Sequence, residues 1–247
     1  MKRKLLYAAI FSVLAALQIA AQGKPKIKFG KIEVSDFDLS AYKVDPQAEA
    51  VVILDAGKTE FMVNEQQRFA LQFKKQKRVK VINKNGFAAA TVEVMLYTNN
   101  GDEEKLESFR ASTYNLENGN VSEVKLNQRD VFTQKLNKNW LAKKFTFPSL
   151  QEGSIIEYSY VIKSNYIFNL QPWEFQGEYP CLWSEYEVYI PEYFQFTNIS
   201  QGYLPLTNHS KHSKPSFLLN QLLIIPKQLR VVFWQIHIKK LSIAEGK

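Results

Sequence analysis

The sequence predicts an all-β protein: an antiparallel β-sandwich with short hairpins, preceded by a signal-peptide helix. Apolar and polar residues alternate with period two over most of the chain, which is the pattern of half-buried strands. Short clusters of Asn, Gly and Asp separate these stretches at spacings that suit antiparallel hairpins. We find no long amphipathic helical pattern and no internal repeat. Because each sheet must bury one apolar face against another, many short strands favour a sandwich.

The chain begins with the three parts of a secretory signal peptide. Lys2, Arg3 and Lys4 give a positive start, an uncharged apolar run follows at 5–19, and small residues precede Gly23. The apolar run is shorter than the roughly 20 residues that a membrane-spanning helix needs. We therefore expect an exported protein with no transmembrane span after signal cleavage.

Three segments beyond the leader show the strand alternation most clearly, and they lie at 78–81, 91–96 and 155–162. Turn signals occur at 55–57, 83–86, 99–102, 118–120 and 152–154. In FPSLQEGS, Pro148 ends one strand and Gly153 permits a tight turn, which predicts a hairpin before the strand IIEYSYVI.

Composition excludes several classes of protein. Hydrophobic residues make up 45% of the chain and charged residues 23%, as in ordinary globular domains. The one cysteine, Cys181, excludes an intramolecular disulfide and a multi-cysteine zinc site. Residues 23–202 hold 22 basic and 23 acidic residues, because the basic excess lies at the two ends. We therefore expect no nucleic-acid partner, and the basic run at 74–78 fits a solvated strand face.

A set of motifs in the middle of the chain resembles a known family. In order, the motifs are AEAVVILDAG at 48–57, KRVKVINKNG at 77–86, ASTYNLENGNV at 111–121, FTFPSLQEGSIIEYSYVI at 145–162, and PWEFQ, PCLWSEYEVYIPEYF and QGYLPLT up to 207. Together they resemble domain-of-unknown-function family 3857. That family is a β-rich envelope module, usually followed by a transglutaminase-like domain with a papain-related Cys-His-Asp site. The resemblance implies the periplasm or cell envelope of a Gram-negative bacterium, and it implies no activity for the module itself.

The leader pattern and the resemblance, which covers 48–207, together divide the chain into a signal peptide at 1–22, a β-sandwich module at 23–207 and an atypical tail at 208–247. Two accounts of the tail compete. In one, strands near 217–225 and 231–238 complete the sandwich. In the other, the reading frame has shifted and the chain is truncated before the transglutaminase-like domain. The abrupt change of composition in the tail, where acidic residues almost vanish, and the loss of the family's usual continuation favour truncation. A chain ending at 207 is then expected to be more soluble.

Four aromatic residues are candidates for ligand binding: Trp173, Phe175, Trp183 and Tyr186. Aromatic rings of this kind can form a platform for a sugar ring or a peptide. Packing in the core or at a sheet edge is the competing explanation, because a cluster of this size near proline breaks is usually internal.

The sequence offers weak catalytic candidates only. Glu185 and Glu187 fall on one strand face, as a glycosidase pair would, but no apolar pocket that would raise one pKa is evident. Cys181 leads into a strand, and the three histidines lie beyond the recognisable domain, so a buried structural thiol is expected. His209 and His212 lie in an apparent loop. We therefore assign no catalytic residue, no metal and no cofactor.

The sequence thus predicts an exported, non-catalytic β-sandwich module. Its predicted role is scaffolding or recognition beside a transglutaminase-like domain that this chain lacks, or beside another envelope protein or peptide. The resemblance implies that the complete parent protein acts on a peptide or protein amide bond. The alternative is a stand-alone carbohydrate- or peptide-binding module that uses surface aromatic residues. A hydrolase acting through Glu185 or Cys181 is the weakest hypothesis.

Overall fold

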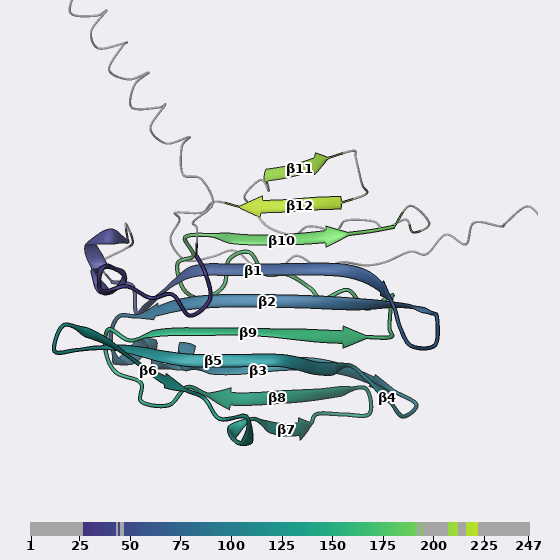
Figure 1. Ribbon diagram of the computed structural model, residues 1–247, viewed down its shortest axis with the longest axis horizontal. Helices are drawn as coiled ribbons and strands as arrows, with labels where there is room; N and C mark the ends of the chain where they lie inside the picture. The colour runs from purple at the N-terminus through teal and green to yellow at the C-terminus, as the bar shows by residue number, and fades with distance from the viewer. Residues whose placement is uncertain are drawn as a thin grey trace, which may run out of the picture.

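The computed structural model describes residues 27–42, 44, 47–191, 194, 207–211 and 216–221, so the predicted signal peptide lies outside the described residues. The described chain is all-β and confirms the predicted fold class (Figure 1). Its strands are β1 (Ala50–Val63), β2 (Phe69–Val81), β3 (Thr91–Asn99), β4 (Asp102–Glu103), β5 (Lys105–Glu117), β6 (Asn120–Lys125), β7 (Phe132–Lys135), β8 (Trp140–Thr146), β9 (Ile155–Ser164), β10 (Ser184–Tyr189), β11 (Thr207–Lys211) and β12 (Ser216–Gln221). The short 3-10 helices are η1 (Val34–Phe37), η2 (Leu39–Ala41), η3 (Lys84–Ala90) and η4 (Gln128–Asp130).

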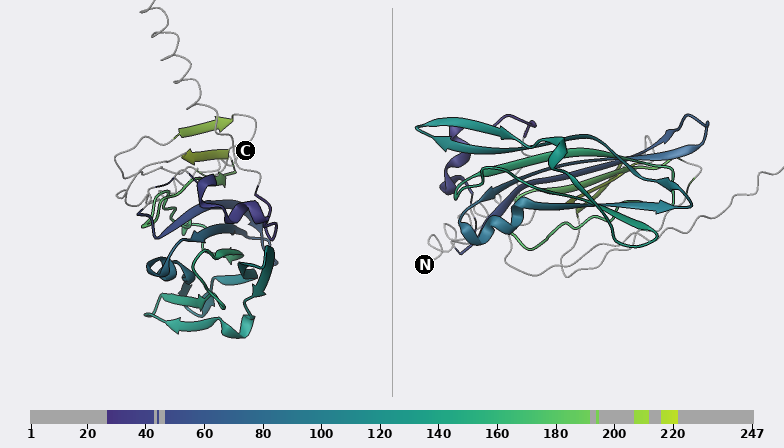
Figure 2. Two further views of the ribbon diagram at one scale, coloured as in Figure 1. Left: turned by 90° about the vertical axis from the view of Figure 1, so that its left-hand side faces the viewer. Right: turned by 90° about the horizontal axis from the view of Figure 1, so that it is seen from below.

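The strands form two sheets that pack around one core. The large sheet has the order β11-β12-β10-β1-β2-β9-β5-β6, and the small sheet has the order β4-β3-β8-β7. Figure 2 shows the small sheet lying over one face of the large one. The core between them is rich in aromatic and β-branched residues, including Phe73, Phe145, Ile156 and Ile162. This is the sandwich that the period-two pattern predicts.

One strand pair departs from the antiparallel prediction. β10 runs parallel to β1, with Asp55 opposite Ser184 and Glu60 opposite Tyr189, whereas the other pairs of neighbouring strands in the described part of the chain are antiparallel. Because β9 and β10 then point the same way, the chain must return between them through residues 165–183. This return segment carries Trp173 and Phe175 back into the core.

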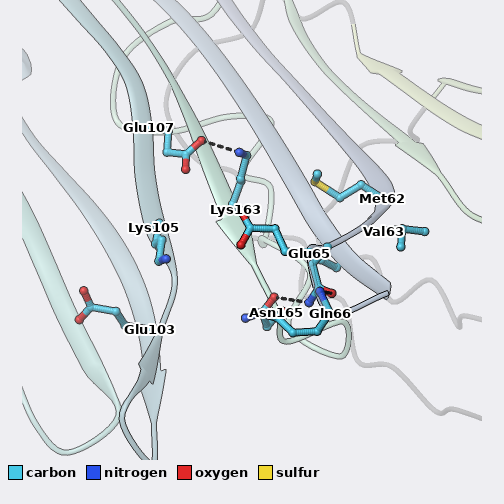
Figure 3. Close-up of a pocket in the computed structure, with 11 residues that line it drawn as sticks. Met62, Val63, Glu65, Gln66, Glu103, Lys105, Glu107, Lys163 and Asn165 are labelled. Atoms are coloured by element: carbon cyan, nitrogen blue, oxygen red, sulfur yellow. Dashed lines mark hydrogen bonds and ion pairs between the residues drawn. The ribbon is translucent and has the colours of Figure 1, made fainter. Parts of the chain in front are cut away.

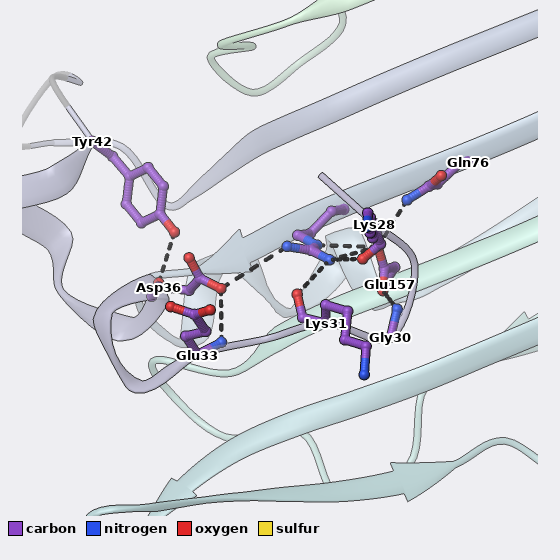
Figure 4. Close-up of polar contacts among 9 residues, drawn as sticks. Lys28, Gly30, Lys31, Glu33, Asp36, Tyr42, Gln76 and Glu157 are labelled. Carbon is purple, nitrogen blue, oxygen red and sulfur yellow. Dashed lines mark hydrogen bonds and ion pairs between the residues drawn. The ribbon is translucent and has the colours of Figure 1, made fainter. Parts of the chain in front are cut away.

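The alternation in β9 is real, but the strand is buried on both faces. Ile156, Tyr158, Tyr160 and Ile162 face the core, as predicted. The opposite face is buried near Glu157 because residues 27–42, which we call the lead-in segment, lie across it (Figure 4). The sequence predicted a strand buried on one face only. The lead-in segment that covers the other face is distant along the chain, and the period-two pattern does not reveal such a contact.

Two of the predicted hairpin turns are confirmed. Asn99 pairs with Asp102 across the β3–β4 turn, and Glu117 pairs with Asn120 across the β5–β6 turn. In the second turn, Asn118 and Gly119 both have positive φ values, of 50° and 78°. An Asn-Gly pair adopts this geometry at low cost, which explains why the short-range signal was sufficient.

Two other turn predictions are wrong. Residues 55–57 lie inside β1. A glycine is needed at position 57, because a Cβ there would collide with the Trp173 ring. FPSLQEGS does not close a hairpin, because it joins β8 of the small sheet to β9 of the large sheet. At 55–57, a contact with the return segment decides the structure. At FPSLQEGS, the connection between the two sheets decides it.

A buried ion pair fixes the lead-in segment to the large sheet (Figure 4). Arg78 on β2 is 3% exposed and Glu157 on β9 is 0% exposed. Arg78 Nε donates to Glu157 Oε1 at 3.1 Å, and Nη2 donates to the carbonyls of Lys28 and Lys31 at 2.9 and 3.0 Å. Glu157 also accepts from the backbone N–H of Gly30 at 2.7 Å. Both charges are therefore buried with partners, as stable burial of ions requires.

Lys80 forms a second attachment to the same segment. Its Nζ donates to the carbonyls of Phe37 and Gly153, each at 2.9 Å, and lies 4.7 Å from the centre of the Phe37 ring. Burial lowers the pKa of Lys80 from 10.5 to about 8, against the opposing effect of Asp36 and Asp38. The outer face of β2 therefore holds the start of the described chain through two cationic side chains.

Candidate functional site

The four aromatic candidates lie inside the protein. Trp173, Phe175, Trp183 and Tyr186 are between 0% and 9% exposed. Trp173 stacks on Tyr186 with 5.1 Å between ring centroids and 11° between the planes. The indole N–H of Trp173 donates to Ser184, and that of Trp183 donates to Glu185. Their role in binding stays a prediction; a ligand could contact these rings only after the covering chain moved.

The thiol of Cys181 is buried, as expected from the sequence. Burial, followed by the nearby charge of Asp55, raises its pKa from 9.0 to about 12. Catalytic thiols have lowered pKa values because the thiolate is the reactive form. The environment of Cys181 therefore favours the unreactive protonated state.

Glu185 and Glu187 share the outer face of β10, as the sequence predicted. Glu185 accepts from Trp183, and Glu187 accepts from the hydroxyl of Tyr189 at 3.0 Å. His209 lies on β11, with no described side chain, and His212 and His237 lie outside the described residues. Within the described ranges, no group of three His, Cys, Asp or Glu side chains is placed to hold a metal ion.

The basic run at 74–78 forms part of β2, and the strand divides it between the two faces. Lys74 is exposed on the outer face, whereas Lys75 and Lys77 lie on the inner face of the large sheet and contact Asp55 on β1. Lys75 Nζ lies 3.0 Å from Asp55 Oδ1, and Lys77 Nζ lies 3.1 Å from Oδ2. The expectation of a wholly solvated face was therefore wrong, since period two sends alternate lysines inward.

This cluster of Asp55, Lys75 and Lys77 on the inner face of the large sheet is the polar site that sequence reasoning missed. Asp55 is 5% exposed and is shared by two ammonium groups, so it neutralises only one of them. Lys75 Nζ also lies 4.2 Å from the centre of a Trp173 ring. Burial lowers the pKa of Lys75. Burial also acts to lower the pKa of Lys77, but the charge and the hydrogen bond of Asp55 outweigh it, so the pKa of Lys77 is raised. These contacts brace β1, β2 and the return segment against one another.

A second polar region lies where the β1–β2 loop meets β5 and β9 (Figure 3). It encloses about 230 Å³ and is lined by both acidic and basic side chains. Lys163 pairs with Glu107 at 2.9 Å, and Asn64 donates to Asn165 at 3.0 Å. Glu103 and Lys105 also line the hollow. Its charges are mixed and open to solvent, which gives it no single preference for an anion or a cation.

The fold and these contacts define a β-sandwich domain in which the buried polar groups mainly hold segments together. Comparison with family models gives a match over residues 67–214 to the family described as "Domain of Unknown Function with solved-structure structure (DUF3857)". The match covers more than half of the chain, so the chain belongs to the DUF3857 family. It confirms the family resemblance seen in the ordered motifs. No curated protein matches the chain in sequence.

Two of the solved structures that resemble this chain illustrate the range of likeness. One is described as "a putative protease" from Parabacteroides distasonis ATCC 8503, with a TM-score of 0.53 and 12% identity over 74% of this chain and 37% of that one. The other is described as "a putative nutrient binding protein" from Legionella pneumophila, with a TM-score of 0.33 and 10% identity over 75% of this chain and 67% of that one. The first likeness shows a shared fold. This chain spans little more than a third of that protein's length.

The helical segments among the described residues are short 3-10 helices. None of them is both long enough and apolar enough to span a bilayer.

Proposed function

We propose that the chain is an exported, non-catalytic module that serves as a scaffold or recognition partner beside a transglutaminase-like domain in the bacterial envelope. Membership of the DUF3857 family supports this architecture, since the family resemblance implies a transglutaminase-like neighbour. The basic start and apolar run at 1–22 support export.

The observation that carries the proposal is the state of the thiol. Cys181 is the one cysteine in the sequence, it is buried, and burial raises its pKa to about 12. Cysteine-dependent acyl transfer needs a thiolate with a lowered pKa and a base within hydrogen-bond reach. The nucleophile of such a reaction would therefore be supplied by the neighbouring domain, and this module would position that domain or its substrate.

The test combines residues 23–247 with a separately purified transglutaminase-like domain from another DUF3857-family protein. We expect the module alone to show no cysteine-dependent amide hydrolysis or transfer. We expect it to bind the domain and raise its kcat/KM for a peptide amide, and the Cys181→Ser variant to do so equally. Activity of the module alone that disappears in Cys181→Ser, or failure to bind the domain, would contradict the proposal.

Export has its own measurement. After expression of the full chain in a Gram-negative host, intact mass of the periplasmic fraction should show a product without the leader at 1–22. A full-length product confined to the cytoplasm would contradict the expected location.

A further inference from the structure

The outer face of the large sheet is only partly covered by the lead-in segment. Beside that segment, strand register places residues of five neighbouring strands in one row: Glu185 on β10, Ala56 on β1, Gln76 on β2, Ser159 on β9 and Arg110 on β5. Figure 1 shows the same five strands side by side. Register partners lie on the same face, so these side chains share one surface.

This row lines a hollow of about 360 Å³ that also includes Lys58 and Lys74. The volume falls within the range of small-ligand sites, which runs from about 300 to 1,000 Å³. Ala56 and Gly57 contribute little side-chain bulk to the lining. The hollow therefore offers space for a short polar ligand on the sheet surface.

Ser159 is a buried hydroxyl without a partner in this hollow. Its side chain belongs to a residue only 9% exposed, and its Oγ forms no hydrogen bond within the described structure. Buried polar atoms are nearly always hydrogen-bonded, because an unmet donor or acceptor costs about 1–3 kcal/mol. An unmet hydroxyl that lines a hollow is therefore a specific sign of a missing hydrogen-bond partner.

Arg110 stands beside Ser159 and has a guanidinium group available for binding. The two residues are register partners on β5 and β9, so their Cβ atoms are expected to lie about 4.5–5.5 Å apart. The guanidinium carbon lies 4.2 Å from the centre of the Phe29 ring, and Arg110 makes no ion pair or hydrogen bond in the described part of the chain. The stacked ring holds the cation in position and leaves its N–H donors unused.

The other cations that line the hollow, Lys58, Lys74 and Lys75, each have a carboxylate partner. Lys58 and Lys74 contact the same carboxylate, Glu60, at 2.7 and 3.2 Å. Arg110 differs from these lysines because it has no carboxylate partner within the described structure, although Glu185 and Glu187 also line the hollow. A single carboxylate matches one guanidinium and one hydroxyl donor, whereas the carboxylates of Glu185 and Glu187 would repel a phosphate dianion more strongly.

We propose that Arg110 and Ser159 bind the carboxylate of an acidic peptide segment in this hollow, with the guanidinium and the hydroxyl as donors. The proposal names a ligand class for the recognition role proposed above and rests on that role. The binding test below needs no transglutaminase-like domain. Peptide binding can therefore fail while the assay with that domain succeeds, and peptide binding can succeed while that assay fails.

The experiment titrates the ¹⁵N-labelled mature chain, residues 23–247, with acetyl-Ala-Glu-Ala-amide, its Gln analogue and inorganic phosphate. The Glu peptide should cause saturable shifts at Ser159 and Arg110, and the Gln peptide should bind about tenfold more weakly, because a charge-assisted hydrogen bond is lost. Arg110→Gln should weaken binding about tenfold as well. Arg129→Gln, an exposed arginine on η4, is the matched control and should change nothing.

The Ser159→Ala variant separates binding from folding. It should weaken the Glu peptide several-fold while leaving the unfolding midpoint unchanged or slightly higher, because it removes an unmet buried hydroxyl. Equal binding of the Glu and Gln peptides, or equal losses in Arg110→Gln and Arg129→Gln, would overturn the proposal. Tighter binding of phosphate than of the Glu peptide would also overturn it, by assigning the hollow to phosphate.

Discussion

Gly57 and Trp173 show how one missing side chain shapes the core. Gly57 lies inside β1, where glycine ordinarily weakens a strand, yet its lack of a Cβ lets the Trp173 ring lie directly against the backbone. That ring in turn stacks on Tyr186 and accepts the Lys75 ammonium over its face. One glycine therefore permits a cluster that joins β1, β2, β10 and the return segment.

Gly57→Ala should lower the free energy of unfolding by about 1–3 kcal/mol, because an added methyl group overpacks the core against an aromatic ring. Urea unfolding monitored by tryptophan fluorescence measures the change. Gly177→Ala is the matched control, since nothing lies within 4 Å of a Cβ built there. Equal effects in the two variants would show that the Trp173 contact is not the cause.

Cys181 makes a prediction about alkaline pH. Burial raises its pKa in the folded state from the ordinary 9.0 to about 12. The folded state therefore keeps the proton that the unfolded state releases, and this contribution is fully present below pH 9 and lost as the pH rises toward 12. Stability relative to Cys181→Ala should fall with a limiting slope of about 1.4 kcal/mol per pH unit.

The measurement is urea unfolding of both proteins at pH 8, 9, 10 and 11. Taking the difference removes the effects of Lys80 and the buried tyrosines, which titrate in both proteins. A difference that stays constant over this range would mean that the thiol is more exposed than the structure shows.

At the scale of elements, the lead-in segment depends on the pair formed by Arg78 and Glu157. Replacing Glu157 with Gln leaves the buried Arg78 with Asp36, 4.0 Å away, as its remaining carboxylate partner, and weakens the contact with Gly30 (Figure 4). Removing one partner of a buried ion pair costs about 3–5 kcal/mol. We expect Glu157→Gln to destabilise the fold by a value near the lower end and to release the segment.

Limited trypsin digestion reports that release, because Lys28 and Lys31 lie within the segment. Cleavage at these lysines should be faster in Glu157→Gln than in the wild type. Lys163→Gln is the control: its pair with Glu107 has side chains 44% and 39% exposed, so its loss should cost less than about 1 kcal/mol. Similar digestion patterns for both variants would argue against the anchoring role.

Local sequence signals predicted the elements whose structure is decided locally. The Asn118-Gly119 turn and the alternation of Ile156, Tyr158 and Tyr160 depend on neighbouring residues, and both are found where expected. The turn predicted at 55–57 failed because a ring from the return segment, far along the chain, decides that conformation. The inward lysines escaped prediction for the same reason, since the position of Asp55 opposite them is fixed by strand register.

At the scale of the whole molecule, the edge of the large sheet depends on the tail. β12 pairs with β10 in an antiparallel register that places Leu219 opposite Tyr186, and β11 pairs with β12. The family match ends at 214, between these two strands. The two accounts of the tail therefore give different expectations for β10. In one account the tail completes the sandwich, and in the other it follows a shifted reading frame.

If β12 completes the sheet, a chain ending at 207 lacks β12, and β10 keeps only β1 as a neighbouring strand. We expect the amides of β10 that face β12 to exchange with solvent at least tenfold faster in that shorter chain, because their strand becomes a sheet edge. Hydrogen exchange followed by mass spectrometry measures the difference, and β9 serves as an internal control. Unchanged exchange in β10 would favour the shifted frame and, with it, the predicted gain in solubility.

The parallel pairing of β1 with β10 also sets the order in which the large sheet can be completed. β1 and β2 adjoin in sequence and can pair early, but the other edge of β1 needs residues up to Tyr189. A chain that emerges from its amino end therefore exposes an apolar, unpaired strand edge until almost the entire module has been made. During that interval, a chaperone that binds extended segments, or a second unfinished copy, would compete with β10 for the same hydrogen bonds.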